Sequence, residues 1–349
     1  MKRYTALLCL LLCASLLAAC AGAPTPAAEP APEPEETFVP CEDGRDRPST
    51  RGRLQVCDGQ LCGEDGESVM LRGVSSYGLP MGESFINEAL FEELSREDGV
   101  NLFRLALYTW GVGIVGYCTE GDRERLKEDI RKGVELAEQA DMYVIVDWHI
   151  LQDGDPNTYA EEARAFFAEM AGEFAGKRNV LYEICNEPNG VSWEDICRYA
   201  REIIPVIREK DPDSVIIVGT PDWSRRVDEA AKAPLAYENL LYTLHFYAAS
   251  HKEELRETLR AAREEGLPIF VTEYGITASS GGFPRDTEEA DRWIALLEEK
   301  GISYCMWSFS KVAEPCSAIR SNCLKYSGFT EEDYTETGLW LLETLKKHG

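Results

Sequence analysis

Two glutamates close two of the strand-like stretches of the sequence, and both stand next to turn residues. Glu187 lies near the end of residues 180–190, VLYEICNEPNG, and Glu273 lies in residues 268–275, PIFVTEYG. Hydrolysis of a glycosidic bond needs two carboxyl groups that flank the bond, one to protonate the leaving oxygen and one to attack the sugar or activate water. A single exposed glutamate is usually a solvated surface charge. A catalytic pair therefore requires a fold that brings Glu187 and Glu273 together.

Several further polar residues fall at the ends of predicted strands, where they could support such a pair. Arg104 would keep Glu273 ionised as a nucleophile, and the apolar, tryptophan-rich surroundings of Glu187 would favour its protonated form. The other supporting candidates are Asn186, His149, His245 and Tyr247.

The two histidines His149 and His245 allow a second interpretation, because together with Asp147 they could ligate a metal ion. No third ligand stands at a suitable spacing, and the sequence contains no CxxC or HExxH motif. We therefore expect histidines that orient their neighbours, and we expect neither a metal nor an organic cofactor. His251 and His348 are interpreted as surface residues.

Aromatic residues also follow several predicted strands. They could be core residues, but rings at the mouth of a barrel are flat apolar platforms that suit the faces of sugars. We predict a substrate-binding role for Trp307, Tyr108, Trp223 and Tyr77.

Short apolar runs alternate with amphipathic helical segments along most of the chain. The candidate strands are residues 68–76, 101–108, 142–149, 179–187, 214–220, 240–247, 268–275 and 302–310. This order predicts an α/β fold, a (β/α)8 TIM barrel that forms one catalytic domain with its active site at the carboxyl ends of the strands. A doubly wound open sheet is the alternative, which eight regular units without a GxGxxG motif disfavour. Residues 54–62, LQVCDGQLC, predict a short hairpin at the lower mouth of the barrel.

The first 20 residues, MKRYTALLCLLLCASLLAAC, are typical of an export signal, with a basic start, a short apolar run and small residues before a cysteine. Because residues 17–20, LAAC, resemble a lipobox, we predict lipidation of Cys20, with an ordinary cleavage site as the alternative. The lipid would hold the protein on the cell surface or on a periplasm-facing membrane; the alternative is a secreted protein. Residues 21–50, rich in Pro, Ala and Glu, are predicted to be an extended linker, and residues 51–349 the catalytic domain.

Acidic residues outnumber basic ones, with 62 Asp and Glu against 36 Lys and Arg and a formal net charge of −26. This balance argues against nucleic acid as a partner, because the phosphate backbone would be repelled. A neutral polymer such as a β-glucan would not be repelled. We expect a monomer that contacts a membrane only through its N-terminal lipid.

Three of the 12 cysteines lie in the signal region, which leaves nine that cannot all pair among themselves. Export would permit disulfides, and the shortest closures would join Cys57 to Cys62 and Cys316 to Cys323. Two further cysteines in apolar strands are expected to be buried thiols, namely Cys185 and Cys305.

Across the motifs at its predicted strand ends, the sequence resembles glycoside hydrolase family five, and closely its bacterial endoglucanase subfamily two. The resemblance extends from residue 54 to near the C-terminus and rests on LRGVSSYG, RLALYT, VIVDWHILQDGDPN, YEICNEPNG, IIVGTPDWS, YTLHFYAASH, PIFVTEYG and the strand of Trp307. It implies a retaining mechanism on β-1,4-glucan, with Glu187 as acid and base and Glu273 as nucleophile. Asn186 would bind the sugar 2-hydroxyl, and Trp307 would lie below the sugar at the cleavage point. The supporting positions of the family match Arg104, His149, His245 and Tyr247.

Three departures from the family pattern concern the sugar-binding positions. Tyr77 stands where the subfamily usually has histidine, and Met81 stands where it commonly has tryptophan. After the last strand, Lys311 comes one position earlier than the usual lysine, whereas Glu314 matches the family's acid. Both Lys311 and Glu314 remain candidates for substrate binding.

The sequence thus predicts an endo-β-1,4-glucanase that hydrolyses internal bonds of cellulose or related β-glucans. The same barrel could act on mannan, xylan or mixed-linkage glucan, because the fold and the catalytic pair do not fix the sugar. A glycan-binding lipoprotein without hydrolytic activity is a further alternative, which the intact glutamate pair disfavours.

Strict alternation along residues 180–190 puts Glu183 and Glu187 on one face of a strand and Asn186 on the other. A regular strand cannot send both Asn186 and Glu187 into a cleft, so we predict a bulge or twist at its end. Glu183, which lies deeper, is expected to be the buried partner of an arginine such as Arg72.

Overall fold

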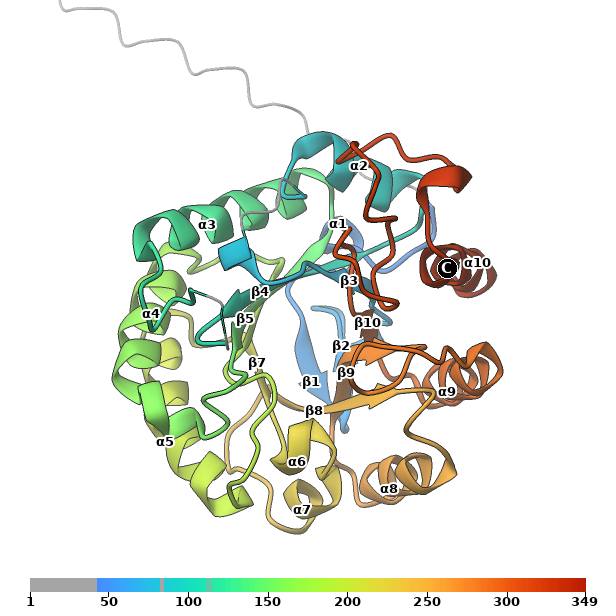
Figure 1. The fold of residues 1–349 in the computed structure, drawn as a ribbon. Coiled ribbons are helices and arrows are strands. Elements are labelled where there is room, and N and C mark those ends of the chain that lie inside the picture. Colours follow the sequence, from blue (N-terminus) through green and yellow to red (C-terminus); the bar gives the residue numbers. More distant parts are fainter. Residues whose placement is uncertain (1–42, 82–84, 112, 114) are drawn as a thin grey trace, which may run out of the picture. The chain divides into compact units, whose positions relative to one another are not determined.

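Eight parallel strands form a closed barrel in the computed structural model, which describes residues 43–81, 85–111, 113 and 115–349. Each strand pairs with the next one along the chain, and the last strand closes the barrel against the first (Figure 1). The strands are β3 (Arg72–Ser75), β4 (Leu102–Tyr108), β5 (Tyr143–His149), β6 (Val180–Glu183), β7 (Val215–Val218), β8 (Leu240–Tyr247), β9 (Ile269–Gly275) and β10 (Tyr304–Met306). The predicted (β/α)8 barrel is confirmed.

Helices surround the strands (Figure 1). They are α2 (Glu88–Arg96), α3 (Arg123–Gln139), α4 (Ala160–Glu173), α5 (Trp193–Lys210), α7 (Val227–Lys232), α8 (Glu253–Glu264), α9 (Thr287–Lys300) and α10 (Glu336–His348), with short turns at α1 (Pro48–Arg51), α6 (Pro221–Ser224), η1 (Leu79–Met81), η2 (Pro156–Tyr159) and η3 (Glu331–Asp333). Local signals set the helix starts. In α5, for example, Ser192 and Asp195 form a reciprocal capping box that satisfies two backbone N–H groups.

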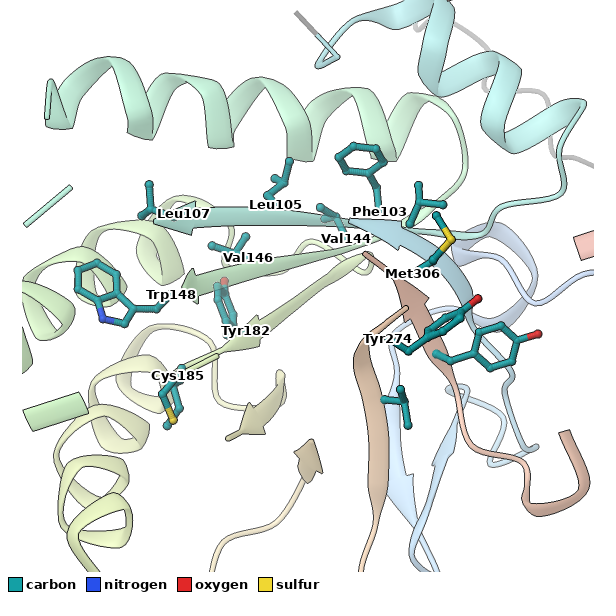
Figure 2. Packing of buried hydrophobic residues seen from close by; sticks show 14 of the residues in the cluster. Phe103, Leu105, Leu107, Val144, Val146, Trp148, Tyr182, Cys185, Tyr274 and Met306 are labelled. Atoms are coloured by element: carbon teal, nitrogen blue, oxygen red, sulfur yellow. The ribbon is translucent and has the colours of Figure 1, made fainter. Parts of the chain in front are cut away.

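The main hydrophobic core lies between the outer face of the barrel and the helices. Alternate strand residues point outward and are fully buried, as Phe103, Leu105 and Leu107 do on β4 (Figure 2). Because the inner face of each strand is buried too, the strand sequences are nearly continuous apolar runs.

A second core fills the N-terminal half of the barrel interior. The strands contribute Leu102, Tyr143, Ile145, Leu181, Val215, Ile217, Leu241, Phe270 and Cys305. The hairpin of β1 (Gln55–Cys57) and β2 (Gln60–Cys62) adds Leu54 and Leu61 to the same cluster. The predicted hairpin is therefore present, and it closes the end of the barrel opposite the strands' carboxyl ends.

The predicted export signal, with Cys20, and most of the predicted linker lie outside the described residues. The last part of that linker is described and differs from the prediction, because it is packed rather than extended. Arg47 is fully buried, and its guanidinium donates to the hydroxyl and to the carbonyl oxygen of Ser95, both at 2.8 Å. The end of the linker therefore lies before Arg47, and not at residue 50. Among the described residues, no helix has the length and apolar character needed to cross a membrane.

The prediction of a disulfide between Cys57 and Cys62 is wrong, because both residues are thiols. In the hairpin register Cys57 faces Gln60 and Cys62 faces Gln55. The two cysteines are thus diagonal neighbours, and their thiols are in hydrogen-bond contact with each other rather than covalently joined.

The second predicted disulfide is also absent, because Cys316 and Cys323 have other partners. The Cys316 thiol donates to Glu314 at 3.5 Å and the Cys323 thiol donates to Asp333 at 3.4 Å. The expectation of buried thiols is confirmed for Cys185 and Cys305.

The hairpin should contribute measurably to stability through Leu61, which is 5% exposed inside the lower core. We expect Leu61→Ala to lower the free energy of unfolding by about 2–5 kcal/mol, since it removes buried methyl groups and leaves a cavity. Leu324→Ala is the matched control, because Leu324 is 91% exposed. Urea unfolding measures both, and an equally small change in the two variants would show that the hairpin does not support the barrel.

Candidate active site

The chain leaves the sheet just before the first candidate glutamate. Regular pairing of β6 with its neighbours ends at Glu183. Beyond that point the Asn186 N–H donates to the Trp148 carbonyl at 3.2 Å, and both Asn186 and Glu187 reach the mouth of the barrel. The prediction that a regular strand does not continue through Glu187 is confirmed, although the strand ends there rather than resuming after a bulge.

An irregularity in β9 turns the second glutamate into the barrel. Thr243 of β8 pairs with Phe270, but His245, two residues further on, pairs with Glu273, three residues further on. This extra residue is a bulge, which lets both Thr272 and Glu273 face the interior. The bulge was not predicted from the sequence. Strict alternation from Phe270 would have placed Glu273 on the outward face, so a Glu273 that faces the interior already implied such an irregularity.

Arg104 of β4 lies at the centre of the site and is fully buried. Its Nε donates to Glu183 Oε2 at 2.7 Å, and its Nη1 donates to Glu273 Oε2 at 3.1 Å. Its Nη2 donates to Asn186 Oδ1 at 2.7 Å and lies 3.0 Å from Asp147 Oδ2. One guanidinium therefore holds three carboxylates from three strands and the side-chain amide of Asn186.

The prediction that an arginine pairs with Glu183 is confirmed, but the partner is Arg104 and not Arg72. Arg72 shares the outward face of β3 with Val74, which lies in the outer core. There Arg72 forms an ion pair of 2.7 Å with Glu298 of α9. A residue on the outward face of a strand cannot reach the barrel interior.

Glu187 and Glu273 face each other across the mouth, with one oxygen of each within 4.8 Å of the other. Both oxygens of Glu273 act as acceptors, since Oε1 receives the Tyr247 hydroxyl at 2.8 Å and Oε2 receives Arg104. Such surroundings suit a carboxylate rather than a carboxylic acid. The side chains of Glu187 and Glu273 are 17% and 6% exposed, so both can be reached from the mouth.

A chain of hydrogen bonds runs from Glu187 into the barrel. Thr272 Oγ1 donates to Glu183 Oε1 at 2.6 Å, so this hydroxyl accepts from His245 Nε2 at 2.9 Å. His245 therefore carries its proton on Nε2 and presents Nδ1 as an acceptor, 3.0 Å from Glu187 Oε1. This tautomer matches the protonated form of Glu187, whose hydroxyl can donate to Nδ1.

The electrostatic surroundings favour the same protonation state. Burial raises the pKa of Glu187 to about 7 against the opposing effect of Arg104 and Arg225, with a smaller upward contribution from the carboxylates of Asp147 and Glu183. Burial also lowers the pKa of His245 to about 4, so that its ring is neutral near pH 7. Glu187 and Glu273 thus stand in different environments, one suited to an acid and the other to a carboxylate.

His149 and Asn186 are fixed in a second set of hydrogen bonds. His149 Nδ1 lies 2.6 Å from Asp147 Oδ2, and its Nε2 lies 3.2 Å from Asn186 Nδ2. Because Asp147 accepts and the amide nitrogen donates, the His149 proton is on Nδ1 and the ring is neutral. Burial accordingly lowers the pKa of His149 well below its usual value. Arg104 on the other side of the amide leaves Asn186 a single orientation.

Among the described residues, one group of side chains has the spacing needed to hold a metal ion. It consists of Glu187, His245 and Glu273, whose ligand atoms lie within 4.8 Å of one another. These atoms already have protein partners. His245 Nδ1 faces Glu187, and both oxygens of Glu273 accept from Tyr247 and Arg104. The donor set is therefore accounted for by hydrogen bonding between the residues themselves.

One side of the mouth is aromatic. The ring centroids of Tyr108 and His149 are 4.7 Å apart, and those of His149 and Trp307 are 5.1 Å apart, with the rings nearly parallel. Tyr77 lies against Tyr108 and Trp307 at 5.8 and 5.6 Å, and its hydroxyl donates to Glu314 at 3.4 Å. The structure therefore brings four of the predicted substrate-binding residues to this side, namely Trp307, Tyr108, Tyr77 and Glu314.

The other two positions singled out near this side are placed differently. The Lys311 ammonium lies over the Tyr326 ring, 3.5 Å from its centroid. Lys311 is thus engaged in a cation–π contact with Tyr326, and not in the contacts described above for Tyr77, Trp307 and Glu314. Met81, at the end of η1, is 50% exposed.

On the other side of the mouth is a cleft of about 440 Å³, lined by Glu187, Trp223, Arg225, His245, Tyr247, His251, Ser279 and Ser280. Trp223 is 45% exposed there, at the predicted position beside the site. The interpretation of His251 as a surface residue is wrong. The chain turns back after β8, so that His251 lines the cleft and its Nδ1 accepts the Tyr247 N–H at 2.9 Å.

Sequence reasoning also missed Thr272 and Arg225. The signal for Thr272 was available, because a polar residue directly before Glu273 inside an apolar strand needs a buried partner. No such signal marks Arg225, because the sequence does not distinguish it from the adjacent Arg226. Arg226 forms ion pairs with Asp228 and Glu229 instead.

The Arg104 network predicts a pH-dependent loss of stability. Arg104→Leu leaves three buried carboxylates without their cation and should lower the free energy of unfolding by about 3–5 kcal/mol. Without the cation their pKa values in the folded state rise above the unfolded values, so the folded protein binds more protons than the unfolded chain and loses stability as pH rises. Urea unfolding at about pH 5 and about pH 8 should therefore show the larger loss at the higher pH. Arg125→Leu, which removes an exposed pair with Asp129, should change stability by less than about 1 kcal/mol at either pH. A loss of equal size at both pH values would contradict the assignment.

Comparison with known proteins gives a consistent result. A family model described as Cellulase (glycosyl hydrolase family 5) matches residues 62–312. The chain is 42% identical to Endoglucanase A of Butyrivibrio fibrisolvens, over 85% of this chain and 69% of that protein. It is also 42% identical to an endoglucanase of Clostridium saccharobutylicum, over 84% of this chain and 65% of that protein. The chain thus spans about two thirds of the length of these relatives.

Solved structures agree with the family match. The catalytic domain of the Thermobifida fusca endoglucanase Cel5A superimposes with a TM-score of 0.81 at 37% identity, over 86% of this chain and 99% of that one. A variant of the same domain in complex with cellotetraose gives the same TM-score and identity. The closed barrel, the strand-end glutamates and these similarities lead to one conclusion: the chain belongs to glycosyl hydrolase family 5.

Proposed function

We propose that this protein is a retaining endo-β-1,4-glucanase that hydrolyses internal bonds of cellulose or related β-glucans. The observation that carries the proposal is the pair of Glu187 and Glu273, with oxygens within 4.8 Å of each other and with contrasting surroundings. Carboxyl groups about 5–5.5 Å apart are typical of retaining glycosidases, whereas inverting enzymes need about 6.5–9.5 Å. The names of the relatives support β-glucan as the substrate.

In this mechanism Glu273 is the nucleophile and Glu187 is the acid and then the base. A Glu273 oxygen attacks the anomeric carbon while the bond to the leaving oxygen breaks, and Glu187 gives its proton to that oxygen. A covalent glycosyl ester of Glu273 and a free chain end result. Water then attacks the same carbon, Glu187 takes a proton from the water, and the Glu273 carboxylate is released. Two displacements restore the original configuration.

The surrounding residues are assigned supporting roles. Asn186, held by Arg104 and His149, would present its amide to the sugar 2-hydroxyl. Arg104 and Tyr247 would hold Glu273 in position for attack. The ring of Trp307 would lie under the sugar at the cleavage point, as its parallel stack with His149 and Tyr108 supports.

We further propose that the protein is exported and tethered by lipid at Cys20, with a Pro/Ala/Glu-rich linker that keeps the barrel at a distance from the membrane. Residues 1–20 support the signal, and the composition of the following segment supports the extended linker. We propose that the enzyme acts as a monomer, because every residue of the glutamate network comes from one chain.

A substrate panel tests the proposed activity. We expect reducing ends to be released from soluble β-1,4-glucan faster than from xylan or mannan, and the first product observed by NMR to be the β-anomer. A preference for mannan or xylan would assign a different sugar to the same chemistry, and an α-anomer as the first product would rule out the double displacement.

Removing the nucleophile sharpens this test. Glu273→Gln should lower kcat by roughly four orders of magnitude or more, because no other group can form the ester. It should leave binding of cello-oligosaccharides measurable by calorimetry. Glu202→Gln on the exposed face of α5 is the control and should retain full activity. Residual turnover above the expected level in a purified Glu273→Gln sample would remove Glu273 from the mechanism.

The hydrogen-bond chain predicts a specific pH dependence. Because Glu187 must be protonated to act as acid, kcat/KM of the wild-type protein should fall as pH rises through about 7. Thr272→Val removes the acceptor for His245 Nε2, so the proton can move to Nδ1 and stabilise the ionised form of Glu187. The falling limb of the kcat/KM profile should then move by about 0.5 to 1 pH unit toward lower pH, which corresponds to the free energy of one hydrogen bond. Thr258→Val on α8 should leave the limb in place, and an unchanged profile for Thr272→Val would contradict the proposed tautomer.

A further inference from the structure

Glu187 lies beyond the part of β6 that the sheet holds in place. Ladder pairing of β6 with its neighbours ends at Glu183, and the Asn186 N–H still donates to Trp148 O at 3.2 Å. Glu187 itself has no main-chain hydrogen bond to a strand among the described residues. An acid that must come within hydrogen-bond distance of a leaving oxygen therefore needs a support other than the sheet.

The turn that follows β7 supplies this support. The Trp223 N–H donates to Pro188 O at 3.0 Å, and the Ser224 hydroxyl donates to Asn186 O at 2.7 Å. The carbonyls of the two residues that flank Glu187 are thus held by two consecutive residues of one turn. Ser224 is fully buried, and the part of the chain that the structure describes contains no second donor to the Asn186 carbonyl.

This turn has a conformation that its residue types seldom adopt. Asp222, Trp223 and Ser224 have φ angles of 60°, 57° and 53°, in the left-handed region that non-glycine residues occupy only when their surroundings constrain them. Such residues cluster at functional sites. The direction of the Ser224 hydrogen bond is also fixed, because its Oγ accepts the Thr220 N–H at 3.3 Å and keeps its own proton for Asn186 O.

The side chain of Asn186 is held independently of this turn. Its amide oxygen accepts from Arg104 at 2.7 Å, and its amide nitrogen lies 3.2 Å from His149 Nε2 and donates to Ile150 O at 3.2 Å. Loss of the hydrogen bond to the Asn186 carbonyl should therefore leave the amide in its orientation.

The side chain of Glu187 has a single hydrogen-bond partner among the described residues, His245 Nδ1 at 3.0 Å. A shift of its backbone is therefore opposed by one side-chain contact, and a small displacement of a catalytic group lowers the rate strongly. We infer that Ser224 is a positioning residue for Glu187, which acts through the Asn186 carbonyl and keeps the acid within reach of the leaving oxygen. This inference rests on the proposed function, in which Glu187 is the acid.

Two variants remove the Ser224 hydroxyl. Ser224→Ala keeps the Cβ, whereas Ser224→Gly places at this position a residue that adopts a φ of 53° without a steric penalty, so loss of the hydroxyl is separated from loss of folding. The substrates are cellotetraose and dinitrophenyl β-cellobioside, whose leaving group departs without a proton. The parameter measured is kcat/KM, which reports formation of the glycosyl ester, the step in which Glu187 acts as acid.

We expect both Ser224 variants to lose roughly tenfold or more in kcat/KM on cellotetraose and less than about threefold on the dinitrophenyl substrate. Ser95→Ala is the matched control, because Ser95 is also fully buried and its hydroxyl donates to Ala140 O at 2.6 Å, between α2 and α3. It should lower the melting temperature without changing the ratio of the two kcat/KM values. An unchanged ratio in the Ser224 variants would show a structural role alone and overturn the inference.

Glu187→Gln separates a failure of this inference from a failure of the proposed function. It should show the same selectivity for the dinitrophenyl leaving group, but more strongly. If Glu187→Gln shows this selectivity and the Ser224 variants do not, the inference is wrong and the proposed function stands. If Glu187→Gln loses activity equally on both substrates, Glu187 is not the acid and both are wrong.

A crystal structure of the Ser224→Ala protein tests the positioning without turnover. We expect Glu187 Oε1 to lie beyond hydrogen-bond distance of His245 Nδ1, while the Asn186 amide keeps its contact with Arg104. A Glu187 side chain that remains in place in this variant would contradict the role of Ser224 whatever the kinetics show.

Discussion

The structure depends on one buried cation, the guanidinium of Arg104. It is fully buried and contacts Glu183, Glu273 and Asp147, which come from three other strands. Burial of a single unpaired carboxylate is unfavourable by several kcal/mol, so each of these acids is tolerated only because the arginine reaches it. The apolar layer beneath, closed by the hairpin, excludes water from the network and makes the geometry of Arg104 decisive for everything above it.

One cation cannot neutralise all the acids of the mouth, and this imbalance divides their roles. Glu273 takes one arm of Arg104 and the hydroxyl of Tyr247, so that both of its oxygens accept hydrogen bonds. Glu187 receives no arm of Arg104 and instead faces a histidine nitrogen that is itself an acceptor. Arg104 therefore anchors the carboxylate of Glu273. Glu187 receives no such hydrogen bond, so its surroundings favour the protonated form.

The barrel could be predicted from the sequence because its signal is repeated eight times, and the glutamates could be placed because strand ends meet at one mouth. The partner of Glu183 could not. Arg72 and Arg104 are both strand arginines, and only the register decides which of them points inward. The bulge in β9 and the return of the chain at His251 depend on contacts between neighbouring strands, which no local pattern in one strand contains.

Regular structure is interrupted where the chemistry is placed, and the interruptions are connected. The chain leaves β6 before Glu187, and the left-handed turn at Trp223 is hydrogen-bonded to that same segment through Pro188 and Asn186. In the proposed mechanism, a glycan bound in the cleft beside Glu187 would contact a turn that is hydrogen-bonded to the segment bearing Glu187. Contacts remote from the cleaved bond would then stabilise the transition state as well as the bound substrate, which raises kcat rather than merely lowering KM.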